Sequence, residues 1–388
     1  MTLERPLRYG MIGGGPGAFI GAVHRRAAAL DGLAELAAGA FSSDAEKSAA
    51  QGRELRLDPA RVYPSWQAMA ESEAEREEDR LDFVAIVTPN HLHHPVACAF
   101  LERGFHVVCD KPLATTLEDA EDLCRLVAES GLVFALTHNY TGYPMIKQAR
   151  AMVAAGTLGP LRRVSVEYVQ DWLAFPIERD GQKQAAWRTD PERAGAGALG
   201  DIGTHAENVA RYVTGLAPER MAGDVATLVP GRRVEDDASL LIRYAGDARG
   251  VLTCSQVATG EENELTLRVY GTEGSLVWTH RDPNTLRLRK AGGAERLLRR
   301  GSDDLVPAAA RAARLPAGHP EGFLEAFANV YANALRTIAA RAGGAEPDPL
   351  DLDFPTVRDG AIGVHFVETA LRAGATDGWV DAAYTPPG

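Results

Sequence analysis

Residues 7–21 form the stretch LRYGMIGGGPGAFIG, an apolar run that ends in a glycine-rich loop. The run Leu7–Ile12 has the length of a buried strand, and the pattern predicts a helix from about Ala22 to Leu30. Glycines in such a loop let the backbone approach a pyrophosphate, and the helix N-terminus offers N–H donors to it. Gly13-x-Gly15-x-x-Ala18 fits the dinucleotide-binding pattern, whereas Gly21 comes too late, so we expect a lengthened loop. Alone, the pattern also fits a glycine-rich turn without a ligand.

The chain continues by alternating strand and helix patterns, which is typical of a parallel, doubly wound sheet. The predicted strands are Leu33–Phe41, Phe83–Val87, His106–Cys109 and Leu132–Leu136, and the predicted helices are Asp44–Leu55, Pro95–Arg103 and Leu117–Ser130. The charge run Glu71–Arg80 is interpreted as a solvated helix face or loop. We therefore predict an α/β fold whose first domain, residues 1–138, is a nucleotide-binding Rossmann domain.

The pattern changes after Asn139, and residues 139–388 are predicted to form a second domain. Its strands have little helix between them, as in an open, mostly antiparallel sheet with one solvated face. These strands are Arg163–Val169, Ser239–Tyr244, Gly250–Val257, Glu264–Tyr270 and Ser275–Thr279, and the helices are Met145–Ala155, Gly322–Arg341 and Val357–Arg372. Gly292–Pro320 is rich in Gly, Arg, Pro and Ala and is interpreted as irregular. The second domain is therefore α+β.

Length and composition exclude several classes of function. A chain of 388 residues is long enough for two domains of ordinary size. With 41 Lys and Arg against 53 Asp and Glu, its formal charge is −12, which disfavours nucleic acid as a partner. No apolar run has the length of a membrane helix. The four cysteines are scattered and form no CxxC pair, which favours reduced thiols in a cytoplasmic protein.

The end of the second predicted strand bears on cofactor choice. NAD-selective domains usually carry Asp or Glu there to bind the ribose 2′-hydroxyl, and here the position is Ser42, followed by Ser43. No Arg lies in the turn, and Lys47 is the nearest cation. Asp44 is interpreted as the N-cap of the next helix. The choice between NAD and NADP stays open on these residues.

Lys111 follows the buried strand His106–Cys109, at the carboxyl end where doubly wound sheets bind their ligands. Pro112 restricts Lys111 to extended backbone, so its side chain is aimed at one place, and we expect the peptide bond between them to be cis. A desolvated lysine exchanges protons nearer neutrality and can serve a reacting hydroxyl. The alternative is a solvated lysine in a loop.

Asp201 and His205 lie four residues apart, so they share a face of a predicted helical turn. A neutral histidine accepts a hydroxyl proton while a nearby carboxylate orients it. A helix N-cap for Asp201 and a hydrogen-bonded core position for His205 are the structural alternatives. No further ligands stand at metal-site spacing nearby, and we expect no metal.

Taken in order, these motifs are similar to those of one enzyme family. The sequence resembles the glucose–fructose oxidoreductase / inositol dehydrogenase / rhizopine catabolism (Gfo/Idh/MocA) family over nearly its whole length. The motifs that carry the resemblance are the glycine loop, Thr88-Pro89-Asn90 with His93, Cys109-Asp110-Lys111-Pro112, Trp187-Arg188-Thr189-Asp190-Pro191, the run to Asp201 and His205, Tyr270–Leu276 and Phe354–Gly360.

The resemblance implies a catalytic triad of Lys111, Asp201 and His205, and NAD or NADP as cofactor. The residues expected at the cofactor are Gly13, Gly15, Pro16, Gly17, Ala18, Phe19, Ile20, Ser42, Ser43, Thr88, Pro89, Asn90, His93, Asp110, Lys111, Asn139, Trp187 and Arg188. The residues expected at the substrate are Lys111, Tyr143, Trp172, Lys183, Arg188, Asp201 and His205. Core packing is the alternative for the aromatic residues, and it suits Trp187 better than Tyr143.

Three features depart from the family pattern. The glycine loop is long, Asp110 stands where the family has Glu, and Tyr140–Pro144 replaces the usual Arg-Phe run. The shorter carboxylate arm of Asp110 keeps its charge but changes its reach. Contacts to the cofactor or substrate near Tyr140–Pro144 are therefore expected to differ from those of relatives.

The resemblance implies hydride transfer between a nicotinamide and a secondary alcohol of a sugar or cyclitol, with His205 or Lys111 taking the hydroxyl proton. Two alternatives stay open: a redox-neutral enzyme that recycles its cofactor while cleaving or epimerising a glycoside, and a non-catalytic sensor on the same fold. The intact trio argues against a sensor. A homodimer or homotetramer is expected through the open sheet, because Glu264–Tyr270 and Ser275–Thr279 carry apolar residues on both faces.

Overall fold

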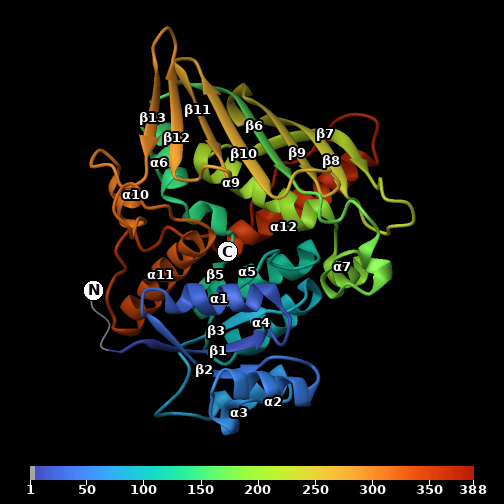
Figure 1. Cartoon of the computed structure of the whole chain (residues 1–388), viewed down its shortest axis with the longest axis vertical. Coiled ribbons are helices and arrows are strands. Elements are labelled where there is room, and N and C mark those ends of the chain that lie inside the picture. Colours follow the sequence, from blue (N-terminus) through green and yellow to red (C-terminus); the bar gives the residue numbers. More distant parts are fainter. Residues whose placement is uncertain (1–4) are drawn as a thin grey trace.

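The computed structural model describes residues 5–388 of the chain, which form two sheets with helices packed on and between them (Figure 1). The first sheet is parallel and has five strands in the order β2-β1-β3-β4-β5. Its strands are β1 (Leu7–Gly13), β2 (Ala34–Ala40), β3 (Phe83–Val87), β4 (His106–Cys109) and β5 (Phe134–Leu136). Every residue of β3 is buried, as expected for a strand that has helices on both faces.

The helices that alternate with these strands follow the predicted order. They are α1 (Phe19–Ala29), α2 (Ala45–Glu54), α3 (Trp66–Ala74), α4 (His93–Leu101) and α5 (Leu117–Ser130). The side chain of Asp44 caps α2 by accepting hydrogen bonds from the amides of Glu46 and Lys47, as the sequence predicted. The doubly wound Rossmann sheet is thus confirmed.

The second sheet has nine strands in the order β13-β12-β11-β10-β6-β9-β8-β7-β14. All neighbouring pairs are antiparallel except β6 and β9. The strands are β6 (Leu161–Val169), β7 (Pro218–Ala226), β8 (Asp237–Tyr244), β9 (Arg249–Ser255), β10 (Glu264–Gly271), β11 (Gly274–Thr279), β12 (Thr285–Lys290), β13 (Glu295–Arg299) and β14 (Val380–Asp381). The predicted large, mostly antiparallel sheet is therefore present.

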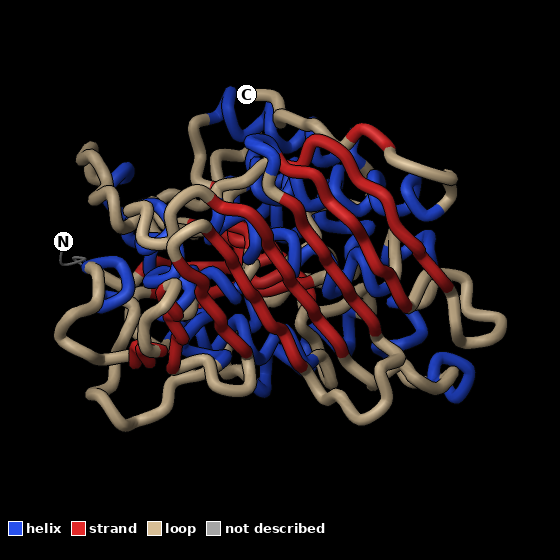
Figure 2. The backbone as a smooth tube through the Cα atoms, turned by 90° about the horizontal axis from the view of Figure 1, so that it is seen from above, coloured by secondary structure: helices blue, strands red, loops and turns tan. Residues whose placement is uncertain are grey.

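Helices cover one face of the second sheet and leave the other open (Figure 2). The helices of this part are α6 (Pro144–Ala154), α7 (Lys183–Arg188), α8 (Pro191–Ala194), α9 (Thr204–Thr214), α10 (Pro307–Arg311), α11 (Phe323–Ala342) and α12 (Val357–Gly374). On α11, Phe327 and Tyr331 pack with Tyr9 and Phe83 of the parallel sheet. We propose that the sheets mark two domains divided at residues 138 and 139, with α11 returning to cover the first. In the described residues, no helix is both long and apolar enough to cross a membrane.

The structure corrects several sequence-based expectations. Gly292–Pro320 is not wholly irregular, because it contains β13 and α10. The charge run Glu71–Arg80 is not merely a solvated surface: Glu73 is fully buried, where its carboxylate pairs with Arg61 and accepts a hydrogen bond from Tyr63. Charge runs are usually solvated, and nothing local in the sequence signals these distant partners.

The open sheet face is more polar than expected. On β10, Leu265, Leu267 and Val269 are buried, while Thr266 and Arg268 alternate with them and line a shallow hollow with Val277 of β11. On β10 the expectation of apolar residues on both faces is met only by Tyr270, which is partly exposed on the same face as Thr266 and Arg268. Strand alternation places the aliphatic side chains of β10 on the buried face.

Candidate active site

A cleft of about 860 Å³ lies where the carboxyl ends of the parallel strands meet residues of the second part of the chain. From the first part it is lined by the glycine loop and by the ends of β2, β3 and β4. The residues that line it from the second part are Gly181, Lys183, Gln184, Ala186, Trp187, Arg188, Arg193, Ala194, Ala196, Gly197, Asp201 and Gln256. Ligands of doubly wound sheets bind at this edge.

The glycine loop is packed too closely against neighbouring backbone to accept side chains at several positions. A side chain on Gly15 would lie 2.6 Å from the carbonyl oxygen of Phe41, and Gly13 has the left-handed φ of +86°. Gly21 packs α1 against the loop, since its Cβ would come within 2.4 Å of the Cα of Gly14. Gly21 thus provides the close helix-to-loop packing expected of the last fingerprint glycine, although its late position in the sequence concealed this.

Ser42 and Ser43 line the cleft at the end of β2, together with Lys47. The hydroxyl of Ser42 accepts a hydrogen bond from the amide of Asp44. The Lys47 ammonium lies 3.3 Å from the Asp44 carboxylate, so this cation already has a partner. The turn therefore presents hydroxyl groups to the cleft, beside an exposed lysine that is paired with Asp44.

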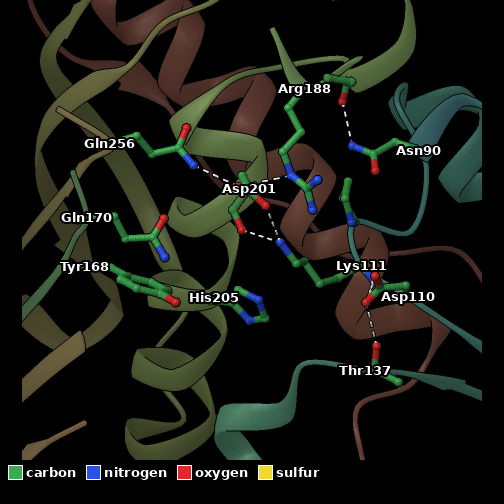
Figure 3. A network of polar contacts seen from close by, with 12 residues as sticks. Asn90, Asp110, Lys111, Thr137, Tyr168, Gln170, Arg188, Asp201, His205 and Gln256 are labelled. Carbon is green, nitrogen blue, oxygen red and sulfur yellow. Dashed lines mark hydrogen bonds and ion pairs between the residues drawn. The ribbon is translucent and has the colours of Figure 1, made fainter. Parts of the chain in front are cut away.

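Lys111 projects from the loop after β4 toward Asp201, and its Nζ lies 2.8 Å from the Asp201 carboxylate (Figure 3). The same ammonium donates to the backbone carbonyl of Asp201. The Lys111–Pro112 bond is cis, as predicted. The cleft thus brings together a lysine and an aspartate that are 90 residues apart in the sequence.

Asp201 lies in a π-helical turn, Leu199–Gly203, that leads into α9. Besides Lys111, its carboxylate accepts a hydrogen bond from Gln256 and lies 3.5 Å from Nε of Arg188 (Figure 3). Burial opposes ionisation, but Lys111 and Arg188 hold the pKa of Asp201 well below its usual range. Asp201 is therefore a fixed anion rather than a proton donor, and it is not a helix N-cap.

His205 lies one turn further along, on α9, beside Lys111 and Asp201 (Figure 3). Burial and the charge of Lys111 lower the pKa of His205 well below its usual value, so the imidazole is neutral at neutral pH. Its Nδ1 lies 3.4 Å from Nδ1 of His138, a buried residue that follows β5. A neutral imidazole at this position is able to accept a proton.

Asp110 precedes Lys111 and holds its loop through hydrogen bonds. Its carboxylate accepts hydrogen bonds from the Lys111 amide and from the Thr137 hydroxyl. Burial works against ionisation, but His24 and Lys111 hold the pKa of Asp110 well below its usual range. The shorter Asp in place of Glu therefore remains charged and fixes the loop that carries Lys111.

Sequence comparisons agree with this geometry. Residues 7–138 match the oxidoreductase family with an NAD-binding Rossmann fold, GFO_IDH_MocA, and residues 146–277 match the GFO/IDH/MocA C-terminal domain. The chain belongs to the GFO/IDH/MocA oxidoreductase family. It is accordingly an enzyme, an oxidoreductase with NAD or NADP as cofactor.

Two curated relatives and two solved structures illustrate the similarity. The uncharacterized oxidoreductase YfiI of Bacillus subtilis is 33% identical, with 98% of each chain covered. Levoglucosan dehydrogenase of Pseudarthrobacter phenanthrenivorans is 30% identical over 73% of this chain and 76% of its own. An oxidoreductase from Sinorhizobium meliloti is 48% identical with a TM-score of 0.88, covering 97% of this chain and 100% of its own. An inositol dehydrogenase homologue from Azotobacter vinelandii, solved with NADH and myo-inositol, is 35% identical with a TM-score of 0.90 and 98% coverage of both chains.

In this GFO/IDH/MocA oxidoreductase, most residues predicted at the cofactor line the cleft, and some do not. Gly17 and Phe19 are exposed and lie outside its lining. His93 is buried below the loop, with its ring nitrogens against the carbonyls of Pro112 and Thr88. Asn139 is buried too, and its amide nitrogen has no partner. His93 therefore supports the loop rather than lining the cleft.

The residues predicted at the substrate also divide. Lys183 and Arg188 line the cleft. Trp187 lines it too, although core packing had been the favoured alternative for this residue. Tyr143 does not: it is buried, and its hydroxyl contacts His280. Trp172 is half-buried outside the lining, with the Arg188 guanidinium 6.0 Å from its ring. Trp187 was expected to be the core residue of the two, but Tyr143 is buried and Trp187 lines the cleft.

Three polar residues at this site were not predicted from the sequence. Gln256 follows β9, and Tyr168 and Gln170 stand at the end of β6, all facing Asp201 and His205 (Figure 3). The amide oxygen of Gln170 is buried and has no hydrogen-bond partner. The available signal was a polar side chain at the end of each strand, but β6 and β9 become neighbours only in the folded sheet.

Proposed function

We propose that this oxidoreductase transfers a hydride between a nicotinamide cofactor and a secondary alcohol of a sugar or cyclitol. The observation that carries the proposal is the Lys111–Asp201 ion pair, which lines the nucleotide cleft, with the neutral His205 buried beside it (Figure 3). An imidazole base and an ammonium donor, side by side, are the groups that alcohol oxidation requires. A sensor would have no use for this arrangement.

Each member of the trio has a proposed role. The Lys111 ammonium donates a hydrogen bond to the reacting oxygen, and Asp201 holds the ammonium in place at 2.8 Å. His205 accepts the hydroxyl proton, because its lowered pKa leaves the ring unprotonated at neutral pH. A nicotinamide cofactor held in this cleft would supply the hydride acceptor for alcohol oxidation, and the hydride donor for the reverse reaction.

The substrate class follows from the groups around the trio. The unpaired amide oxygen of Gln170, the amide of Gln256 and the guanidinium of Arg188 offer hydrogen bonds to several hydroxyls at once. Trp187 adds an apolar ring face to the same cleft. This mixture suits a polyhydroxylated ring. The substrate class is also supported by two relatives, an inositol dehydrogenase homologue solved with myo-inositol and a levoglucosan dehydrogenase.

We propose NAD rather than NADP as the preferred cofactor. A 2′-phosphate needs an uncommitted cation at the end of β2, and the cation there, Lys47, is paired with Asp44. The Asp44 carboxylate would itself repel a phosphate placed beside it. The hydroxyls of Ser42 and Ser43 suit a neutral ribose 2′-hydroxyl better.

A dehydrogenase screen over cyclitols, monosaccharides and glycosides, with NAD and NADP in parallel, tests the proposal. We expect net reduction of NAD with at least one polyol and saturation with its concentration. Product formation without any net change in nicotinamide absorbance would instead identify the redox-neutral, cofactor-recycling alternative. Tight cofactor binding with no turnover of any polyol would refute both and favour a sensor.

We further propose a homodimer or homotetramer formed through the open face of the nine-stranded sheet. No helix of the described residues covers this face in Figure 2, and Leu241 of β8 is half exposed on it. The four cysteines are free thiols, which supports a reducing, cytoplasmic location.

A further inference from the structure

We propose that His94, Cys98 and Asp122 form a binding site for a divalent transition metal, with zinc as the best match. The site is separate from the cleft, since none of the three residues lines it. His94 and Cys98 lie four residues apart on α4, and therefore on one face of that helix. Asp122 comes from α5, which packs beside α4.

The three donor atoms converge as metal ligands do. Nε2 of His94 lies 2.9 Å from Oδ2 of Asp122, the Cys98 sulfur lies 3.9 Å from the same oxygen, and one ligand atom from each residue falls within 4.8 Å of the others. Tetrahedral zinc with bonds of about 2.0–2.3 Å would hold such atoms roughly 3.3–3.5 Å apart. Small side-chain adjustments at this accessible surface would bring the ligand atoms to the separations that zinc requires.

Asp119 supplies the second observation. Its carboxylate lies 3.4 Å from the other ring nitrogen of His94, Nδ1. Metal-bound histidines usually donate their second N–H to a carboxylate, which fixes the ring and the tautomer. Here Asp119 on α5 would orient His94, leaving Nε2 free to bind the metal beside Asp122. The four residues thus reproduce a carboxylate–histidine–metal arrangement with a thiolate added.

The donor set selects the kind of metal. A thiolate, an imidazole and a carboxylate together suit zinc, which binds sulfur, nitrogen and oxygen alike, and they disfavour magnesium and calcium, which prefer oxygen ligands. Asp119 and Asp122 also place negative charge where a dication would bind. Without a metal, the His94 contacts form a surface ion pair and the Cys98 thiol donates a long hydrogen bond to Asp122, and the metal-binding test below distinguishes the two arrangements.

Cobalt substitution tests the site directly, because cobalt bound to thiolate absorbs in the near ultraviolet and cobalt bound to nitrogen and oxygen alone does not. We expect the purified full-length protein to bind one Co²⁺ with this absorption and to release it to Zn²⁺. Cys98→Ser should abolish the absorption, and His94→Ala should weaken Zn²⁺ binding, measured against a chromophoric chelator. Asp119→Asn should weaken it by about 10–100-fold while leaving the thiolate absorption present at saturation.

The control is His319→Ala, which removes an exposed histidine elsewhere and should leave binding unchanged. Chelation of the metal should leave the rate of alcohol oxidation unaltered, since the site is outside the cleft, and this separates the inference from the proposed function. Absence of thiolate absorption, or Zn²⁺ binding by Cys98→Ser equal to that of the unmodified protein, would overturn the proposal. Melting curves of the variants establish that each is folded.

Discussion

Nδ1 of His138 faces Nδ1 of His205 at 3.4 Å, so a hydrogen bond between the two rings needs a proton on one of these nitrogens and a lone pair on the other. If His205 donates, its Nε2 keeps a lone pair and is able to accept the substrate proton. His138 is fully enclosed and follows β5, far from His205 in the sequence. We therefore expect His138 to act as a positioning residue that favours the Nδ1-protonated tautomer of the proposed base.

Substitution His138→Leu should lower kcat/KM for the alcohol by up to about tenfold, since a hydrogen bond of this kind is worth about 0.5–1.5 kcal/mol. Cofactor affinity should be unchanged, because His138 does not line the cleft. His138→Asn retains an acceptor and should recover part of the loss. Equal kcat/KM for both variants and the original enzyme would show that the tautomer of His205 is set by another group.

Replacement of Lys111 by Ala should reduce kcat far more than it weakens cofactor binding. Its ammonium is directed at Asp201 and is proposed to donate a hydrogen bond to the reacting oxygen, and loss of one such donor typically costs about 10²–10³ in rate. Steady-state rates and titration of nicotinamide fluorescence measure the two effects separately. Lys183→Ala is the matched control, since Lys183 also lines the cleft but is exposed. Near-normal turnover of Lys111→Ala would refute the assigned role.

The free energy of unfolding should decrease as the pH falls from 7 to 5. Burial lowers the pKa of His138 to about 3, and burial with Arg341 nearby lowers that of His106 to about 4. Between the unfolded histidine pKa of about 6.5 and these values, the unfolded chain binds protons that the folded chain does not, so stability present above pH 6.5 is lost on acidification. His106→Gln should make the melting temperature less dependent on pH over this range. His319→Gln, at an exposed position, should not.

Cofactor preference should respond to Asp44→Ser. Serine keeps the N-cap of α2 but removes the carboxylate, which frees Lys47 for a 2′-phosphate. Binding of NADP should strengthen relative to NAD, as followed by nicotinamide fluorescence. Ser42→Asp is the opposite change: it should weaken NADP binding and leave NAD binding intact. If neither substitution alters the ratio, the end of β2 does not face the ribose.

Light scattering should return a mass of two or four times the 41.5 kDa chain at micromolar concentration. Leu241→Arg on β8 should shift the distribution toward smaller species, because it places a charge on the open face of the sheet. A single-chain mass for the unmodified protein would contradict an interface on that face.

Much of this protein was determined by local sequence. The parallel sheet and its ligand-binding edge are specified by the apolar run before Gly13, the fully buried β3 and the strand that precedes Lys111-Pro112. Short segments suffice because strand burial and glycine geometry depend on neighbouring residues in the sequence. The i, i+4 spacing likewise predicted that Asp201 and His205 lie on one side of a helical turn, and Asp201 lines the cleft with His205 buried beside it. The resemblance to a family then predicted that Lys111 joins them.

Tertiary structure alone decided the rest. The pairing of β6 with β9 brings Gln170 and Gln256 toward Asp201, and the return of α11 to the parallel sheet crosses the boundary that the sequence pattern suggested. Tyr143 is enclosed and Trp187 lines the cleft, contrary to expectation, because the surroundings of an aromatic side chain depend on distant segments. Packing also brings His138 to His205, and α4 to α5 near Asp122. No local sequence pattern predicts such contacts, because the residues are far apart in the chain.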